Sequence, residues 1–345
     1  MEGDLCDQGL TLSQSGPLLA MFSVKTALCI IGLLLLVYAY FCQNPIKGFH
    51  ANSQVLFKFH CFFVVAGIFG TAMSDGFDLM RFSFLKMLRS GSPENQDCLV
   101  PPMSPFVGVG LKSIKVFGNN GVVYTMTSIA IERIISSLLL ESYEKMNSHI
   151  GWILSLISFC VSLLLVAVRV ALADYSKGLA ITSFTQSAIG FSMQLQYSAA
   201  IIEVVTALLL FVLLFLNIQR LKRRERIVNS LAYKAQIREN VSATSLAFPL
   251  AFLHLLIYLP TGVVMPTLAL SKSTVSDRMQ AVAISDFVPL YYVFFPFILW
   301  WRNRAKKISV ANLLVNNLIR QKEQKNEGEG VETAKYFEML NTMLK

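Results

Sequence analysis

The sequence predicts an all-α membrane protein: a bundle of seven transmembrane helices, with an amphipathic cytosolic helix after the last span. Of its 345 residues, 54% are apolar and only 15% are charged, whereas soluble proteins average about 25% charged residues. One soluble core of this size cannot bury so many apolar side chains. Seven separate stretches also reach the length of about 20 residues that crosses the hydrocarbon layer of a bilayer. These observations disfavour a cytosolic enzyme, a secreted module and a disordered chain.

The predicted spans follow an extracellular N-terminus of residues 1–18. They cover residues 19–42, 55–80, 106–131, 150–173, 193–216, 241–268 and 281–301. The third stretch is the weakest, because it contains two lysines and two adjacent asparagines. The N-terminal segment carries acids and no base, the reverse of a signal peptide, so we expect the first span to be an uncleaved anchor.

The chain after the last span divides into two segments. Residues 302–320 are basic and carry apolar residues at helical spacing. This pattern predicts an amphipathic helix on the inner leaflet, with its bases toward anionic head groups, and a solvated basic tail is the alternative. The polar composition of residues 321–345 predicts a disordered cytosolic tail.

Basic residues are unevenly distributed among the connecting segments. Most of them follow the first, third, fifth and seventh spans, and the densest run is Arg220–Arg226. The positive-inside rule therefore predicts an extracellular N-terminus and a cytosolic C-terminus. The net charge of +9 then belongs to cytosolic loops, and we expect no nucleic-acid partner. The glycosylation sequon at Asn240 falls on the cytosolic side and should be unmodified.

The cysteines and histidines predict no cofactor chemistry. Cys6 and Cys98 face the oxidising side, where they can form a disulfide; the alternative is two free or intermolecular thiols. Four histidines on different segments give no metal-ligand spacing, so we expect no metal. The seventh span has no lysine that could hold retinal. No phosphate-binding loop or nucleophile elbow supports an enzyme.

Several ionisable residues lie inside the predicted spans at a shared depth. Counting 1.5 Å per residue places four of them about 24 to 27 Å from the inner helix ends. These are Asp75, Lys115, Glu203 and Asp286, with His254 and Tyr258 nearby on the sixth span. Charges inside a membrane are functional candidates by default. We expect this layer to line a ligand pocket open to the outside, with Lys115 and Glu203 as its best-placed pair. The alternatives are an Asp75 exposed to water and a protonated Glu203 against a neighbouring helix.

The predicted inner end of the third span carries the adjacent pair Glu132 and Arg133. Such a pair can hold a resting state, and its release can expose a groove for a partner helix. A solvated helix end is the alternative. Arg223 and Arg224 belong to the basic run that extends the fifth span, where they could bind lipid phosphates or an acidic partner surface.

Prolines are concentrated in the sixth and seventh spans. They are Pro249, Pro260, Pro266, Pro289 and Pro296. A proline inside a helix removes a backbone hydrogen bond and tends to kink the helix. Kinks of this kind suit helices that move on activation, although static membrane helices also contain them.

Five short motifs follow one another along the chain. They are Phe49-His50-x-Asn52, Asp78-Leu79, Asp97-Cys98, residues 131–145 (IERIISSLLLESYEK) and residues 233–241 (YKAQIRENV). Together they resemble the nematode serpentine chemoreceptors of the Sra superfamily, most closely class ab or class a, over residues 45–305. Two features differ from rhodopsin-type receptors: Ile134 follows the Glu-Arg pair, and Val293–Trp300 contains no N-P-x-x-Y motif.

The resemblance implies a G-protein-coupled chemosensory receptor in the plasma membrane of sensory neurons, in their cilia. Such a receptor reads small external molecules and activates a heterotrimeric G protein. The resemblance also implies that Glu132 and Arg133 act as a switch beside the G-protein cleft. The alternative is a seven-span ligand-gated channel or transporter, which a continuous polar stripe along one helix face would favour. The sequence leaves open whether the protein forms a dimer.

Overall fold

The computed structural model describes residues 2–43, 49–85, 98–143, 146–182, 189–224, 231–271, 275–302 and 304; in some helical stretches, among them 223–224 and 263–271, it describes the backbone alone. The chain divides into two compact units, Met1–Leu299 and Trp300–Lys345. The predicted amphipathic helix of residues 302–320 and the predicted tail of residues 321–345 fall in the second unit. Apart from residues 302 and 304, both lie outside the described residues.

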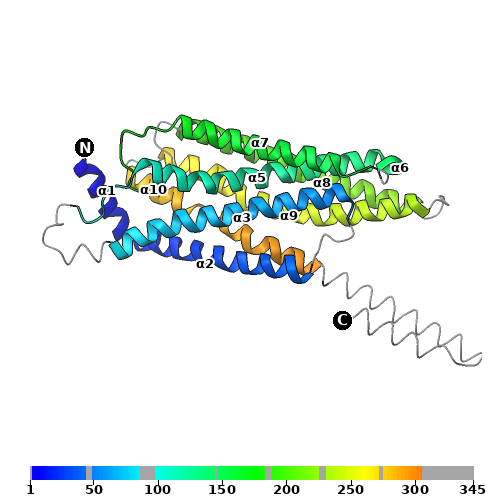
Figure 1. Ribbon diagram of the computed structural model, residues 1–345, viewed down its shortest axis with the longest axis horizontal. Coiled ribbons are helices and arrows are strands. Elements are labelled where there is room, and N and C mark those ends of the chain that lie inside the picture. The colour runs from blue at the N-terminus through cyan, green and yellow to red at the C-terminus, as the bar shows by residue number, and fades with distance from the viewer. Residues whose placement is uncertain are drawn as a thin grey trace, which may run out of the picture. The chain divides into compact units, whose positions relative to one another are not determined.

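The first unit is a bundle of long helices (Figure 1). The helices are α1 (Glu2–Gln14), α2 (Gly16–Tyr38), α3 (Ala51–Met80), α5 (Pro105–Leu138), α6 (Leu140–Tyr143), α7 (His149–Ala171), α8 (Ile189–Arg224), α9 (Leu231–Ser271) and α10 (Val275–Ile284). A last helix covers residues 288–302, of which 288–299 belong to the first unit. The π-helical turns η1 (Ala39–Gln43) and η2 (Arg81–Leu85) continue α2 and α3. Figure 1 shows α1 and α10 at one end of the bundle and α6 at the other.

The predicted all-α membrane bundle is confirmed. Within the described residues, six helical segments are long and apolar enough to cross a bilayer: Gly16–Phe41, Ala51–Phe84, His149–Ala171, Gly190–Lys222, Gln236–Gly262 and Gln280–Arg302. They coincide with six of the seven predicted stretches. The third predicted stretch forms α5, which has 34 residues but is not among the six. Because α5 packs against α3, α7, α8 and α9, much of its surface faces protein rather than lipid and is polar. Its place as the seventh span stays a prediction.

Glycines allow α3 and α5 to approach each other closely. A Cβ atom added at Gly118 of α5 would lie 2.2 Å from the backbone nitrogen of Gly67 in α3. One added at Gly70 of α3 would lie 2.2 Å from the backbone nitrogen of Lys115. Small residues of this kind let membrane helices pack backbone against backbone. The contact fixes Lys115 directly beside α3.

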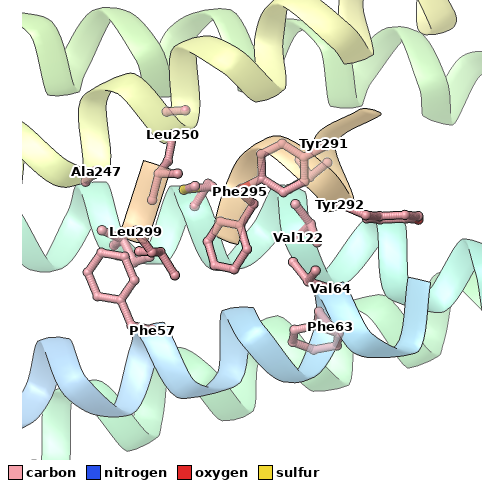
Figure 2. Close-up of a cluster of buried hydrophobic side chains, with 14 of the residues drawn as sticks. Phe57, Phe63, Val64, Val122, Ala247, Leu250, Tyr291, Tyr292, Phe295 and Leu299 are labelled. Carbon is pink, nitrogen blue, oxygen red and sulfur yellow. The ribbon is translucent and has the colours of Figure 1, made fainter. Parts of the chain in front are cut away.

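The main apolar core joins α3, α5 and α9 to the last helix (Figure 2). Tyr291, Phe295 and Leu299 are spaced four residues apart, so they lie on one face of the 288–302 helix. Their partners in the core include Phe57, Phe63, Val64, Val122, Ala247 and Leu250. This core occupies the middle of the bundle, and polar clusters lie on both sides of it along the helix axes.

The predicted seventh span is not one continuous helix. α10 ends at Ile284, residues 285–287 are non-helical, and a helix resumes at residue 288. Thr261 of α9 satisfies the interrupted backbone, because its Oγ1 donates to the Ser285 carbonyl (3.3 Å) and accepts from the Phe287 N–H (3.4 Å). Pro289 consequently stands in the first turn of a helix, where its missing N–H removes no bond. The expected kink at Pro289 is therefore replaced by a complete break.

One end of the bundle, which we call the disulfide end, is closed by α1 and two connecting segments. A disulfide joins Cys6 of α1 to Cys98. Leu12, Leu18 and Phe22 pack in an apolar cluster with Phe82, Val100, Ala180 and Ile181. Met103 and Leu179 exchange two backbone hydrogen bonds of 2.8 and 2.9 Å. The sequence did not predict α1 as a helix, because its composition is mixed and its apolar partners are distant in the chain.

Candidate ligand and switch sites

Four oppositely charged side chains meet near the disulfide end. We call Lys25, Asp75, Lys115 and Asp286 the four-charge cluster; all are at most 6% exposed. Lys115 Nζ lies 2.6 Å from Asp286 Oδ2 and 3.4 Å from Asp75 Oδ1. Lys25 Nζ lies 3.7 Å from Asp75 Oδ2 and 3.9 Å from Asp286 Oδ2. Two positive and two negative charges thus neutralise each other across α2, α3, α5 and the segment after α10.

The break in the last span positions this cluster. Lys25 donates a hydrogen bond to the Ala283 carbonyl at the end of α10. Asp286 Oδ1 accepts from the Val288 N–H (3.3 Å) at the start of the next helix. A cation at a helix C-terminus and an anion at a helix N-terminus both complement the helix dipole. The cluster therefore also caps the two helix ends that the break leaves open.

The structure does not bring together Lys115 and Glu203, the best-placed pair of the predicted pocket, and their role in binding a ligand stays a prediction. Lys115 is held by Asp75 and Asp286, whereas Glu203 Oε1 lies 2.9 Å from His254 Nδ1. Asp75 is 4% exposed, so the alternative that it lies in water is wrong. Lys25 was missed, although it stands 17 residues before Cys42 and so at the same depth of about 25 Å.

Glu203 and His254 form a separate polar centre between α8 and α9. Each is 1% exposed. Tyr258 stacks on the His254 ring, with centroids 5.2 Å apart, and Tyr291 meets it edge-on at 4.6 Å. His60 of α3 joins this centre, since its Nε2 lies 2.8 Å from the Tyr291 hydroxyl. The predicted pocket residues therefore separate into two groups: the four-charge cluster, and Glu203 with His254 and Tyr258.

The other end of the bundle, the Arg133 end, holds a second charged pair. Arg133 Nε lies 2.5 Å from Glu132 Oε2, and Arg133 Nη2 bonds Glu132 Oε1. Three neutral side chains join them: Ser53 of α3 bonds both, Tyr143 of α6 donates to Glu132, and Asn240 of α9 accepts from Arg133 at 3.5 Å. We call these five residues the Arg133 network. Glu132 and Arg133 are at most 1% exposed, so the alternative of a solvated helix end is wrong.

Further hydrogen bonds fix the partners of the Arg133 network. Asn52 Nδ2 donates to the Tyr143 hydroxyl (3.2 Å), and Asn52 Oδ1 accepts from the Gly151 N–H (2.9 Å) at the start of α7. Asn240 Nδ2 donates to the Ser136 carbonyl (3.1 Å). Burial, together with the Glu132 carboxylate, holds the pKa of Tyr143 above its ordinary value, so the hydroxyl keeps the proton that it donates. Asn52, Tyr143 and Asn240 all belong to the motifs that resemble the serpentine chemoreceptors. Those motifs were the sequence feature that could have identified these residues as functional.

The basic extension of α8 is described only in part. The backbone of Arg223 and Arg224 is helical, but their side chains lie outside the described residues. One turn earlier, Arg220 donates to the Ser137 carbonyl (2.8 Å), and Asn217 Nδ2 donates to the Ser137 hydroxyl (3.0 Å). These bonds fasten α8 to α5 beside the Arg133 network. The expected role of Arg223 and Arg224 stays a prediction.

A single helix carries residues of both charged sites. Lys115 and Glu132 are 17 residues apart on the uninterrupted α5, which corresponds to about 26 Å along its axis. α3 likewise carries Asp75 near one end and Ser53 near the other. The four-charge cluster and the Arg133 network are therefore joined by two long helices in backbone contact.

The comparison with known families identifies the group to which the chain belongs. The family model of the serpentine type 7TM GPCR receptor class ab chemoreceptor matches residues 4–345. The match extends beyond residues 45–305, where the motif resemblance was found. The chain therefore belongs to this family, which is one of chemosensory receptors rather than enzymes, and it is a multi-pass membrane protein. No curated protein matches the chain significantly. Among the described residues, no group of His, Cys, Asp or Glu could hold a metal ion.

Proposed function

We propose that the protein is a chemosensory receptor that binds a small external molecule near the disulfide end and activates a heterotrimeric G protein at the Arg133 end. The family match supports the receptor class. The observation that carries the proposal is the pair of buried charged sites on the continuous α5. A ligand that binds one helix arrangement better than another shifts the population at both sites.

The proposed orientation places the disulfide end outside the cell and the C-terminus in the cytosol, in the plasma membrane of sensory neurons and their cilia. The Cys6–Cys98 disulfide supports this orientation, because disulfides persist in oxidising compartments. The buried Asn240 side chain at the opposite end could not carry a glycan in the folded protein. An epitope tag at the N-terminus should be accessible on intact cells, and a tag at the C-terminus only after permeabilisation. The reverse pattern would contradict the orientation.

The proposed signalling step places Arg133 in the contact with the G protein. Once the Arg133 network opens, the guanidinium becomes available to a partner helix that enters between α5 and α9. The test is nucleotide exchange on a heterotrimeric G protein by the receptor in nanodiscs, against a panel of small molecules. We expect exchange to rise with at least one compound in the wild type and not in Arg133→Gln. A ligand-evoked current in liposomes without G protein would instead favour the channel reading.

A further inference from the structure

Glu203 differs from the other buried acids of the described residues in the bonds that it makes. Hydrogen bonds reach Asp75, Asp78, Glu132 and Asp286. Neither carboxylate oxygen of Glu203 has a hydrogen-bond partner in the described part of the chain, although the residue is 1% exposed. His254 Nδ1 lies 2.9 Å from Glu203 Oε1 but makes no hydrogen bond to it. The carboxylate is buried without a donor.

The side chains around Glu203 include three buried rings, those of His254, Tyr258 and Tyr291. The rings of His254 and Tyr258 stack, and Tyr291 stands edge-on to His254. The Tyr291 hydroxyl contacts His60. Arg169 of α7 is a further buried cation, and it interacts electrostatically with Tyr124 and Tyr258. A buried carboxyl group that lacks a hydrogen-bond donor and lies beside aromatic rings is an environment that suits a protonated amine.

Charge balance separates this centre from the four-charge cluster. In that cluster the two lysines and two aspartates already satisfy each other, so a charged ligand would have to break an ion pair to bind there. At Glu203 an ammonium group would supply N–H donors to both carboxyl oxygens, which have no hydrogen-bond partner in the described part of the chain. A carboxylate ligand brings no donor to these oxygens, and an alcohol brings one hydroxyl for two oxygens.

We propose that Glu203 recognises a ligand with a protonated amine, whose nitrogen binds the carboxylate and whose carbon frame lies against Tyr258 and Tyr291. The inference rests on the proposed function, because it names the chemical class of the external molecule. The four-charge cluster then fastens the helices and does not contact the ligand.

The test is the thermal stabilisation of the full-length receptor in nanodiscs by matched probes. Phenethylamine, phenethyl alcohol and phenylacetate share one ring and differ in the polar group; shorter alkyl amines extend the amine series. Because a ligand that binds only the folded state raises Tm, we expect the amines to raise Tm and the alcohol and the acid to leave it unchanged. Stabilisation by the alcohol or the acid to the same extent, or by none of the amines, would overturn the proposal.

Substitutions at Glu203 test whether the amines stabilise the receptor by binding at this residue. In Glu203→Gln we expect the amine concentration for half-maximal stabilisation to rise by about tenfold or more. Glu239→Gln is the matched control, because Glu239 accepts from the His50 N–H at the Arg133 end; it should respond like the wild type. Glu203→Asp keeps the charge and should retain the preference for amines if Glu203→Gln does not fold. An unchanged response in Glu203→Gln would contradict the assignment.

Three further outcomes separate this inference from its alternatives. Acidification to about pH 5 without any amine could stabilise the wild type and not Glu203→Gln; the occupant would then be a proton, and the proposal would fail. If amines bind at Glu203 but no G protein exchanges nucleotide, the proposed function fails and the inference stands. If a compound without an amine activates the wild type and Glu203→Gln equally, the inference fails and the proposed function stands.

Discussion

The four-charge cluster and the Arg133 network are both buried and charged, but their charges are distributed differently among the helices. In the four-charge cluster, each charge lies on a different element and its opposite charges lie on others. In the Arg133 network, Glu132 and Arg133 are adjacent on α5, and the partners from α3, α6 and α9 are neutral.

This difference determines what it costs to separate the helices. Separating an element from the four-charge cluster leaves buried charge without a partner, which costs about 3 to 5 kcal/mol. Separating α9 from α5 at the Arg133 network breaks the bonds of Asn240, while Glu132 still pairs with Arg133. Bonds of this kind contribute about 1 kcal/mol each. The first site therefore fastens the bundle, and the second can open.

The largest expected effect comes from breaking the α3–α5 contact that the two sites share. In Gly118→Ala the new Cβ would meet the Gly67 backbone at 2.2 Å, so one of the helices must shift. We expect most of the folded receptor to be lost from the cell surface. Gly110→Ala on the same helix is the control, because its Cβ would have no neighbour within 4 Å. Equal surface levels of the two variants would contradict the contact.

Removing one charge tests whether the four-charge cluster stabilises the bundle. Lys115→Met leaves Lys25 as the remaining cation within 4 Å of Asp75 and Asp286 in the described part of the chain, and we expect a loss of about 3 kcal/mol in stability. Lys115→Met with Asp286→Asn restores neutrality and should recover most of that loss. Thermal unfolding in nanodiscs measures both. A double variant that is less stable than the single one would show that charge balance is not what stabilises the cluster.

Tyr143→Phe tests whether the Arg133 network holds the resting state, and its expected effect is the smallest. The variant removes the hydrogen bond to Glu132 and the one from Asn52, and should reduce stability by about 1 to 2 kcal/mol. Because it loosens the resting state, basal nucleotide exchange should rise several-fold. Tyr38→Phe is the control, since Tyr38 is 48% exposed. Basal exchange at the wild-type level in Tyr143→Phe would argue against a restraining role for this bond.

The sequence predicted the helices better than the contacts between them. Hydropathy located the segments that became α2, α3, α7, α8 and α9, because lipid-facing surfaces must be apolar along their whole length. It did not reveal the break around Asp286, since the surrounding segment stays apolar while Thr261 and Lys25 satisfy the freed backbone groups.

The depth count found three members of the four-charge cluster but did not separate them from Glu203, which lies in another centre. Depth along a helix follows from residue number, whereas the direction of a side chain depends on how each helix is rotated by packing. Glu203 faces His254, whereas Lys115 faces Asp75 and Asp286. The Glu132–Arg133 pair was found because the two residues are adjacent, while its neutral partners Ser53 and Asn240 come from helices whose packing one sequence does not specify.

The most direct test of the account is the distance between spin labels at Leu138 of α5 and Arg238 of α9, in a background without the other reactive cysteines. The account predicts that Tyr143→Phe combined with Asn240→Ala shifts the distance distribution to longer values, because the neutral bonds that close the Arg133 end are lost. It also predicts that Lys115→Met combined with Asp286→Asn leaves the distribution in place. An unchanged distance in the first variant, or an equal shift in the second, would contradict the central claim that the Arg133 end opens while the four-charge cluster holds.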